Sequence, residues 1–158
     1  GEQVKNALEG IGVKVLKNQA VKIDSPAVQG SNQPLYLVGI GAYIAKNSDV
    51  NKALAELLNN SPRVVMMHNP ASFAAFPPHT APLAVAGHTH GGQIRLPSTP
   101  QWSYLSLIKG EEVYGDAWIK NYGEAGNNLY VNRGIGFSDV PIRINCAPEV
   151  TLFTLRSK

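Results

Sequence analysis

A chain of 158 residues fits a single domain, residues 1–158, and is long enough to bury a core of its own. It is 44% hydrophobic and 16% charged, and the 14 Lys and Arg residues behind its net charge of +3 form no cluster, which argues against a nucleic-acid-binding patch. No apolar run approaches the roughly 18 residues of a membrane span, and the single cysteine, Cys146, excludes an internal disulfide and leaves cytoplasmic and peripheral membrane locations open.

The N-terminal part is predicted to hold one short helix and two short strands. Apolar residues spaced by four and three positions predict an amphipathic helix over Gln3–Ile11, with Val4, Leu8 and Ile11 on its apolar stripe. Short β-like runs follow at Val13–Leu16 and Val21–Ile23, and a polar, turn-rich loop is expected from Pro26 to Pro34.

The next segment predicts a βαβ unit. One strand is expected at Leu35–Ile40 and another at Arg63–Met67. Between them, Asp49 is placed to cap a helix whose apolar face consists of Val50, Ala53, Leu54, Leu57 and Leu58. A strand, a helix and a strand in this order predict parallel pairing of the two strands.

The remaining sequence alternates helical and strand-like segments. The expected elements are a short helix at Pro70–Phe76, a strand at Leu83–Ala86, loops with a hairpin between Leu96 and Asn128, and strands at Leu129–Asn132, Ile142–Asn145 and Val150–Leu155. Both faces of the last strand carry apolar residues, so we expect it to be covered on both sides. The whole pattern predicts an α/β fold.

The most informative motif is Gly-His-Thr-His-Gly-Gly-Gln at residues 87–93, directly after a predicted strand. In α/β sheets, ligands gather at the carboxyl ends of strands, and glycines allow tight turns beside an ion. His68 ends a neighbouring predicted strand, and neutral imidazole is a common metal ligand. His68, His88 and His90 are therefore candidate metal ligands, with histidines bonded to the backbone as the alternative, and His79 in a proline-rich loop is expected at the surface.

Five segments together carry a resemblance to a known family. They are Val64-Val65-Met66-Met67-His68-Asn69-Pro70, Leu83-Ala84-Val85-Ala86 with the motif at 87–93, Leu129-Tyr130-Val131-Asn132-Arg133-Gly134-Ile135-Gly136, Pro141-Ile142-Arg143 and Pro148-Glu149-Val150. In this order and spacing they resemble the calcineurin-like metallophosphoesterase superfamily, and more narrowly its bacterial phosphodiesterase-like branch. The resemblance implies the C-terminal half of a β-sandwich whose mixed sheets are flanked by helices.

The same resemblance implies a dinuclear metal site and a phosphoester substrate. In the superfamily, the positions of His68 and His88 bind one metal, and the position of His90 binds the other. Two divalent ions, manganese, iron or zinc, then hold the phosphate oxygens and generate a hydroxide for in-line attack.

The carboxylate motifs of the superfamily are missing from this sequence. Asp-x-His, Gly-Asp-x-x-Asp and Gly-Asn-His precede the histidine motifs in the superfamily, and none of them occurs here. We therefore expect a chain that begins just after the missing Gly-Asn-His and holds its metals partly or not at all. Removal of the first half would expose a sheet edge and hydrophobic surface, so a homo-oligomer or a complementing N-terminal half is the expected partner.

Four other polar residues are candidates for the surroundings of the site. Arg133 and Arg143 could reach a phosphate or could form a structural ion pair. Gln93 could orient a ligand or could occupy a turn. Asn69 could support a metal ligand or could form an Asn-Pro turn.

Two functions stay open at this point. The first is a metal-dependent phosphoesterase that hydrolyses phosphodiesters or phosphomonoesters, with this chain supplying the histidine half of the dinuclear site. The second is a catalytically inactive fragment that acts as a metal-binding, assembly or partner-binding module.

Overall fold

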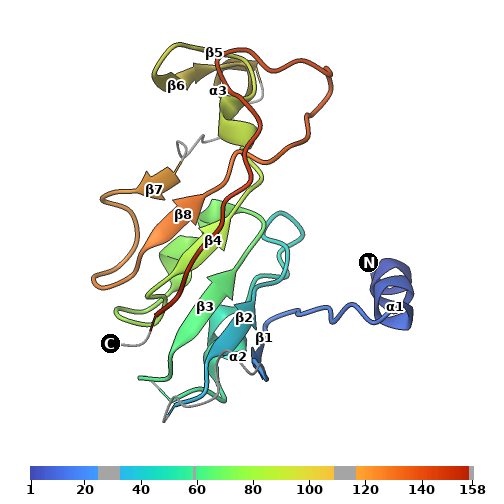
Figure 1. Ribbon diagram of the computed structural model, residues 1–158, viewed down its shortest axis with the longest axis vertical. Coiled ribbons are helices and arrows are strands. Elements are labelled where there is room, and N and C mark those ends of the chain that lie inside the picture. The colour runs from blue at the N-terminus through green and yellow to red at the C-terminus, as the bar shows by residue number, and fades with distance from the viewer. Residues whose placement is uncertain (25–32, 59, 109–116, 157–158) are drawn as a thin grey trace.

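The computed structural model describes residues 1–24, 33–58, 60–108 and 117–156. Its centre is a six-stranded mixed sheet with the strand order β1-β2-β3-β4-β8-β7 (Figure 1). The strands are β1 (Gln19–Lys22), β2 (Tyr36–Gly39), β3 (Arg63–Met66), β4 (Ala84–Ala86), β7 (Ala117–Ile119) and β8 (Leu129–Val131). β2, β3, β4 and β8 run parallel, and β1 and β7 pair antiparallel at the edges. The predicted α/β class with a mixed sheet is confirmed.

The predicted βαβ unit is present and positions the first of the histidine-bearing strands. β2 and β3 pair in parallel, and α2 (Val50–Leu54) connects them. The Asp49 side chain accepts a hydrogen bond from the backbone N–H of Lys52 at 2.9 Å, which caps the helix as expected. The helix ends at Leu54 rather than Leu58, because Leu58 is 74% exposed and adds no packing that would stabilise another turn.

One face of the sheet carries the hydrophobic core. It is covered by α2 and by the 3-10 helix η2 (Pro70–Ala75), which occupies the position predicted for a short helix (Figure 1). The Asn69 side chain accepts a hydrogen bond from Ala71 N–H at 2.8 Å and so caps η2. The core side chains interdigitate between these helices and the sheet: Val38, Val50, Ala53, Val65, Phe73, Phe76, Ala84, Leu129 and Val131.

The opposite face of the parallel strands is also apolar but less well covered. Leu37, Val64 and Val85 are half-buried there, and Met66 is 39% exposed. The C-terminal segment, residues 148–156, runs lengthwise along the strands beside β8, where Phe153 packs against Tyr130 (Figure 1). Apolar residues on both faces are typical of parallel strands that are covered on both sides. This face is therefore suited to bury more surface than the described residues cover.

The strand predicted at Val150–Leu155 is wrong. The segment is extended, but it joins neither sheet, and its side chains alternate between the sheet and solvent. Phe153 packs edge-on against Tyr130 with ring centroids 5.1 Å apart, whereas Val150 is 88% and Leu152 91% exposed. Side-chain contacts rather than backbone pairing hold the segment, so the expected cover on both sides is also wrong.

The N-terminal helix α1 (Glu2–Gly10) forms one residue earlier than predicted and stands apart from the sheet (Figure 1). None of its residues is buried, and Val4 and Ile11 are 62% and 77% exposed. The strand predicted at Val13–Leu16 is wrong, because this segment is a linker without a β partner and β1 begins at Gln19. Most of the loop predicted from Pro26 to Pro34 lies outside the described residues.

A small antiparallel hairpin confirms the hairpin predicted after Leu96. It consists of β5 (Arg95–Leu96) and β6 (Thr99–Ser103), and it leads into an unpredicted helix, α3 (Tyr104–Ile108). β6 and α3 contact the 3-10 turn η3 (His90–Gly92), which contains the second histidine of the motif. The strand predicted at Ile142–Asn145 is wrong, since only a single bridge joins Ile94 and Ile144.

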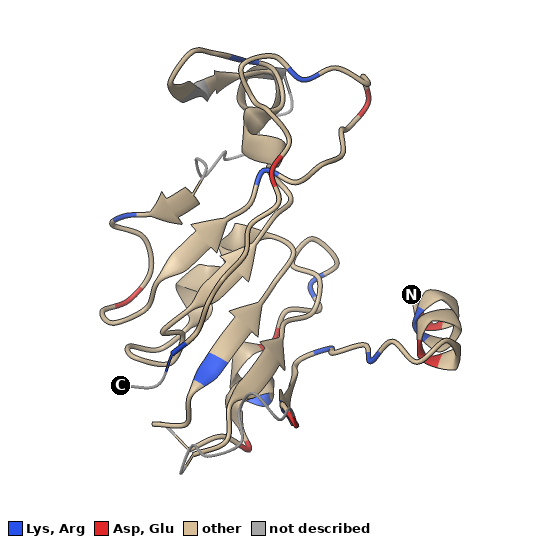
Figure 2. Ribbon diagram, viewed as in Figure 1, with Lys and Arg blue, Asp and Glu red and all other residues tan. Residues whose placement is uncertain are grey.

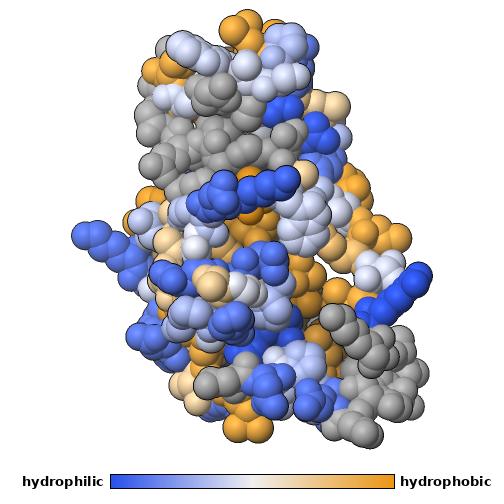
Figure 3. Space-filling model, turned by 90° about the vertical axis from the view of Figure 1, so that its left-hand side faces the viewer, coloured by the Kyte–Doolittle hydropathy of each residue, from blue (hydrophilic) through white to orange (hydrophobic). Residues whose placement is uncertain are grey.

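The surface agrees with the dispersed charge of the sequence. Basic and acidic residues are scattered over the coloured part of the ribbon, and the residues described there form no continuous basic stripe (Figure 2). On the face drawn in Figure 3, hydrophobic atoms form separate patches between hydrophilic ones. In the described part of the chain, no helix has the length and apolar character needed to cross a bilayer.

The core assignment predicts a large effect of truncating Phe73, which is fully buried against Phe76 and Tyr122. Phe73→Ala should lower the free energy of unfolding by about 3–5 kcal/mol, because the cavity it leaves cannot collapse completely. Phe137→Ala is the matched control, since Phe137 is 57% exposed and its loss should change that free energy by less than about 0.5 kcal/mol. Urea unfolding of both variants tests this, and equal effects would contradict the assignment.

Candidate metal centre

The carboxyl ends of β3, β4 and β8 meet at one edge of the sheet and bring the predicted histidines together. Gly87 N–H donates to the carbonyl of His68 at 3.0 Å, and Asn132 N–H donates to the carbonyl of Ala86 at 2.8 Å. These bonds continue the parallel ladder one step beyond the strands. His68 and His88, which follow β3 and β4, therefore lie side by side.

The rings of these two histidines are in contact. His68 Nε2 lies 3.1 Å from His88 Nδ1, and the ring centroids are 4.9 Å apart at an interplanar angle of 65°. Two imidazole nitrogens on one ion, each at about 2.0–2.1 Å from it, are separated by about 2.9 Å in octahedral and about 3.4 Å in tetrahedral geometry. The observed separation falls in this range, so the pair fits a shared divalent ion.

The environment of His68 favours the form that can bind a metal. Partial burial lowers the pKa of His68, and the neighbouring His88 and His90 lower it further. A lower pKa keeps the imidazole neutral, and only a nitrogen without a proton can donate its lone pair to a metal ion.

The backbone that presents His88 and His90 is unusually strained. φ is 70° at His88, 48° at His90, 60° at Gly91, 84° at Gly92 and 58° at Gln93. For residues with a Cβ, each such left-handed conformation costs on the order of 1 kcal/mol or more and persists only where the surroundings enforce it. Strain of this kind clusters at functional sites, and here it coincides with the histidine motif.

Arg143 and Cys146 hold this strained loop in place through hydrogen bonds. The His90 carbonyl accepts hydrogen bonds from Arg143 Nη2 and Cys146 Sγ, each at 3.0 Å. Arg143 also donates to the carbonyls of Cys146 at 2.8 Å and Arg133 at 3.0 Å, and to that of Gly136. Its guanidinium thus connects three segments of the chain. Arg143 therefore has a structural role here, whereas the sequence suggested a phosphate ligand or an ion-pair partner.

Arg133 takes part in the ion pair that the sequence offered as one alternative. Its Nε lies 2.8 Å from Glu149 Oε2. The same carboxylate accepts hydrogen bonds from Thr151 Oγ1 at 2.7 Å and from the Tyr130 hydroxyl. Burial alone would raise the pKa of Glu149, but these hydrogen bonds outweigh it and lower the pKa to about 2. The role of Glu149 is not evident in the sequence, because Tyr130 and Arg133 are 19 and 16 positions away along the chain.

The third predicted ligand, His90, is turned toward another residue. Its Nδ1 lies 3.2 Å from Gln93 Oε1, and Gln93 is completely buried. Within residues 1–24, 33–58, 60–108 and 117–156, no group of three His, Cys, Asp or Glu side chains is arranged to hold a metal ion. The structure therefore brings His68 and His88 together, whereas His90, two residues after His88 in the same loop, contacts Gln93. His79 is exposed, as expected.

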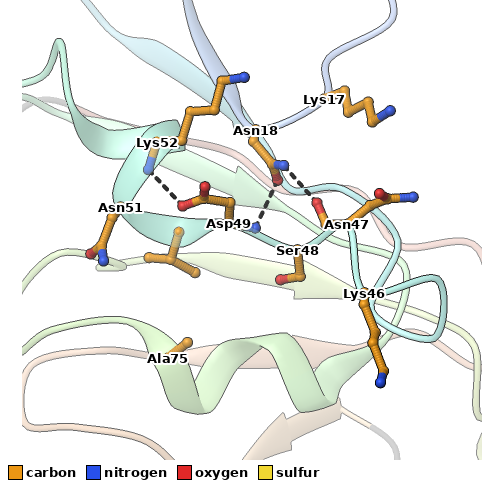
Figure 4. Close-up of a pocket in the computed structure, with 10 residues that line it drawn as sticks. Lys17, Asn18, Lys46, Asn47, Ser48, Asp49, Asn51, Lys52 and Ala75 are labelled. Atoms are coloured by element: carbon orange, nitrogen blue, oxygen red, sulfur yellow. Dashed lines mark hydrogen bonds between the residues drawn. The ribbon is translucent and has the colours of Figure 1, made fainter.

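A separate basic cavity of about 550 Å³ lies next to the N-terminus of α2 and contains none of the three histidines in its lining (Figure 4). Lys17, Lys46 and Lys52 surround it. The buried Asn18 in its wall accepts hydrogen bonds from Gly41 N–H at 2.7 Å and Asp49 N–H at 3.1 Å. Asn18 thus fastens the loop between β2 and α2.

The chain is similar in sequence to several known proteins. The chain is 35% identical to phosphodiesterase YaeI of Escherichia coli over 155 residues, which cover 98% of this chain and 50% of that protein. It is 33% identical over 112 residues to the uncharacterized metallophosphoesterase YkuE of Bacillus subtilis, covering 70% of this chain and 37% of that protein. The chain belongs to the metallophosphoesterase family.

Its relatives within the metallophosphoesterases differ in their named activities. UDP-2,3-diacylglucosamine pyrophosphatase LpxG of Chlamydia trachomatis is 27% identical over 144 residues, covering 89% of this chain and 43% of that protein. The chain spans about half the length of the curated relatives it matches. No family model and no solved structure matches it.

The left-handed conformation of the histidine loop predicts that Gly91 cannot be replaced without loss of stability. An added Cβ would lie 2.6 Å from Arg133 Cγ and 2.8 Å from Cys146 Sγ, at a φ of +60°. Gly91→Ala should therefore lower the free energy of unfolding by about 2–4 kcal/mol. Gly136→Ala is the control, because its added Cβ meets nothing within 4 Å. In thermal unfolding this control should be as stable as the unaltered chain. An equal loss of stability in both variants would contradict the prediction.

The Glu149 cluster predicts a stability that depends on pH. Because folding lowers the pKa of Glu149 from 4.5 to about 2, its stabilisation is fully present above about pH 4.5 and is lost as the pH falls toward 2. Glu149→Gln should cost about 3 kcal/mol at pH 7, and the deficit should shrink below pH 4. Urea unfolding at pH 7 and pH 3.5 measures this, with the exposed Glu124→Gln as control. A deficit that does not change with pH would contradict the role of the carboxylate.

Proposed function

We propose that this chain supplies the histidine half of a dinuclear site in a metal-dependent phosphoesterase. In this proposal His68 and His88 bind one metal ion, and His90 binds the other. The main support is the 3.1 Å contact between His68 Nε2 and His88 Nδ1 at the carboxyl edge of the sheet. The metallophosphoesterase relatives support the same reaction class.

The chemistry of the donor set suits such a site. When bound, two divalent ions hold the phosphate oxygens and supply a hydroxide for attack on phosphorus. Imidazole nitrogens are suitable ligands for manganese, iron and zinc, but they are neutral and leave the charge of the ions uncompensated. The carboxylate motifs that would compensate it are missing from this sequence. The complete site therefore requires acidic ligands from outside this chain, and in this proposal the histidines of the chain alone hold metal only partly.

In this proposal, hydrogen bonds and an ion pair within the chain fix the positions of the site residues before a metal or substrate binds. Arg143 and Cys146 hold the carbonyl of His90, and this fixes the backbone on which both loop histidines stand. The Glu149 carboxylate holds Arg133 at the end of β8. Rigid support of this kind keeps ligands in place in the absence of metal, which lowers the entropic cost of binding.

A second candidate function is a metal-binding or assembly module without catalysis. It is favoured by the absence, among the described residues, of a three-ligand group and by the exposed apolar residues Val150, Leu152 and Val4. Such residues would suit contact with a second copy of the chain or with a complementing N-terminal half.

Metal binding tests the proposed ligands. Titration of the chain with manganese or zinc in a calorimeter should show binding that His88→Ala weakens at least about tenfold, because one nitrogen donor is lost. His79→Asn is the matched control: His79 is exposed, lies outside the motif, and has a φ of +61°, which Asn tolerates. Unchanged binding in His88→Ala would contradict the proposal.

Hydrolysis separates the two candidate functions. Because the complete site requires acidic ligands from outside this chain, the chain is assayed together with a complementing N-terminal half, with bis-p-nitrophenyl phosphate and manganese, before and after the His88→Ala substitution. Turnover that disappears in the variant supports a phosphoesterase. Metal binding without turnover in the complemented protein supports the module.

A further inference from the structure

Gln93 is a completely buried amide whose four hydrogen-bonding positions are all used. Its Nε2 donates to the carbonyl of Ser138 at 3.0 Å and to that of Val140 at 2.9 Å. Its Oε1 accepts from the backbone N–H of Ser138 at 2.6 Å and lies 3.2 Å from His90 Nδ1. A glutamine side chain has two N–H donors and two acceptor lone pairs, so this amide is fully satisfied.

These partners fix which end of the amide faces His90. If the amide were turned over, its NH2 group would face the N–H of Ser138, and its oxygen would face the carbonyls of Ser138 and Val140. Both arrangements would leave buried polar groups unpaired, and each such group costs about 1–3 kcal/mol. The oxygen must therefore point toward His90.

The fixed oxygen determines the protonation of the imidazole. A carbonyl oxygen cannot donate, so His90 Nδ1 must carry a proton to bond with Gln93 Oε1. In a neutral imidazole the other nitrogen, Nε2, then holds the free lone pair. We propose that Gln93 is a positioning residue that fixes His90 as the Nδ1–H tautomer and leaves Nε2 as its metal-binding nitrogen. This inference rests on the proposed function for the statement that His90 binds a metal.

The backbone around Gln93 supports a positioning role. Gln93 has a φ of 58°, in the left-handed region that a branched or long side chain rarely adopts. The N–H of Ile144 also donates to the Gln93 carbonyl at 3.0 Å. Through side chain and backbone, Gln93 connects the histidine loop to residues 138–144, which follow β8. A ligating histidine commonly donates its other N–H to such a partner, and loss of that partner weakens metal affinity about 10–100-fold.

Nitrogen NMR of the metal-free, 15N-labelled chain at pH 8 tests the tautomer directly. His90 should show a protonated Nδ1 and an unprotonated Nε2, which is the reverse of the tautomer that a free histidine side chain favours in water. The exposed His79 provides an internal comparison in the same spectrum. An unprotonated Nδ1 on His90 overturns the inference. This measurement needs no substitution, so it decides the question even if variants fail to fold.

A substitution then tests the cause. Gln93→Met keeps the length of the side chain but removes the acceptor, and His90 should shift toward the Nε2–H tautomer with zinc affinity about 10–100-fold lower. Gln19→Met is the control, since Gln19 is exposed and distant in sequence from the histidines. A folded Gln93→Met variant that keeps the Nδ1–H tautomer overturns the inference. If the unaltered chain shows the Nδ1–H tautomer but binds no zinc, the role of Gln93 stands and the proposed function fails.

Discussion

The parallel pairing of β3 with β4 is the constraint on which the site depends. Because the two strands are in register and end together, the N–H of Gly87 bonds to the carbonyl of His68, and the next residue, His88, meets the His68 ring at 3.1 Å. A shift of one residue along either strand would turn its side chains to the other face and separate the rings. The hydrophobic core beneath β3 and β4 therefore also determines the geometry of the histidines.

Beyond the strands, the site is held by groups that come from the last third of the chain. Arg143 and Cys146 donate to the carbonyl of His90, and Gln93, within the histidine loop, donates to the carbonyls of Ser138 and Val140. These bonds oppose a backbone that would relax from its left-handed conformations if it were free. Arg143, which the sequence offered as a phosphate ligand, thus acts on the histidine loop through its backbone.

The elements that depend on local patterns could be predicted from the sequence. The βαβ unit followed from two apolar runs and the Asp49 cap, and the proximity of His68 and His88 followed from their place at strand ends. The C-terminal segment could not be predicted, because its alternation is that of a strand while its attachment depends on the ring of Phe153 and on Glu149 and Thr151. The orientation of His90 could not be predicted either. It depends on hydrogen bonds from Gln93 to Ser138 and Val140, which lie 45 and 47 positions further along the chain.

Several apolar residues of the described part of the chain are exposed. This exposure is consistent with the finding that the chain spans about half the length of its metallophosphoesterase relatives. We propose that His68 and His88 share one metal ion. Anomalous diffraction from a crystal of the chain soaked in manganese can locate that ion. A shared ion gives a peak within coordination distance of both His68 Nε2 and His88 Nδ1. A well-ordered pair of rings with no peak between them, or a peak that only one of them contacts, would contradict it.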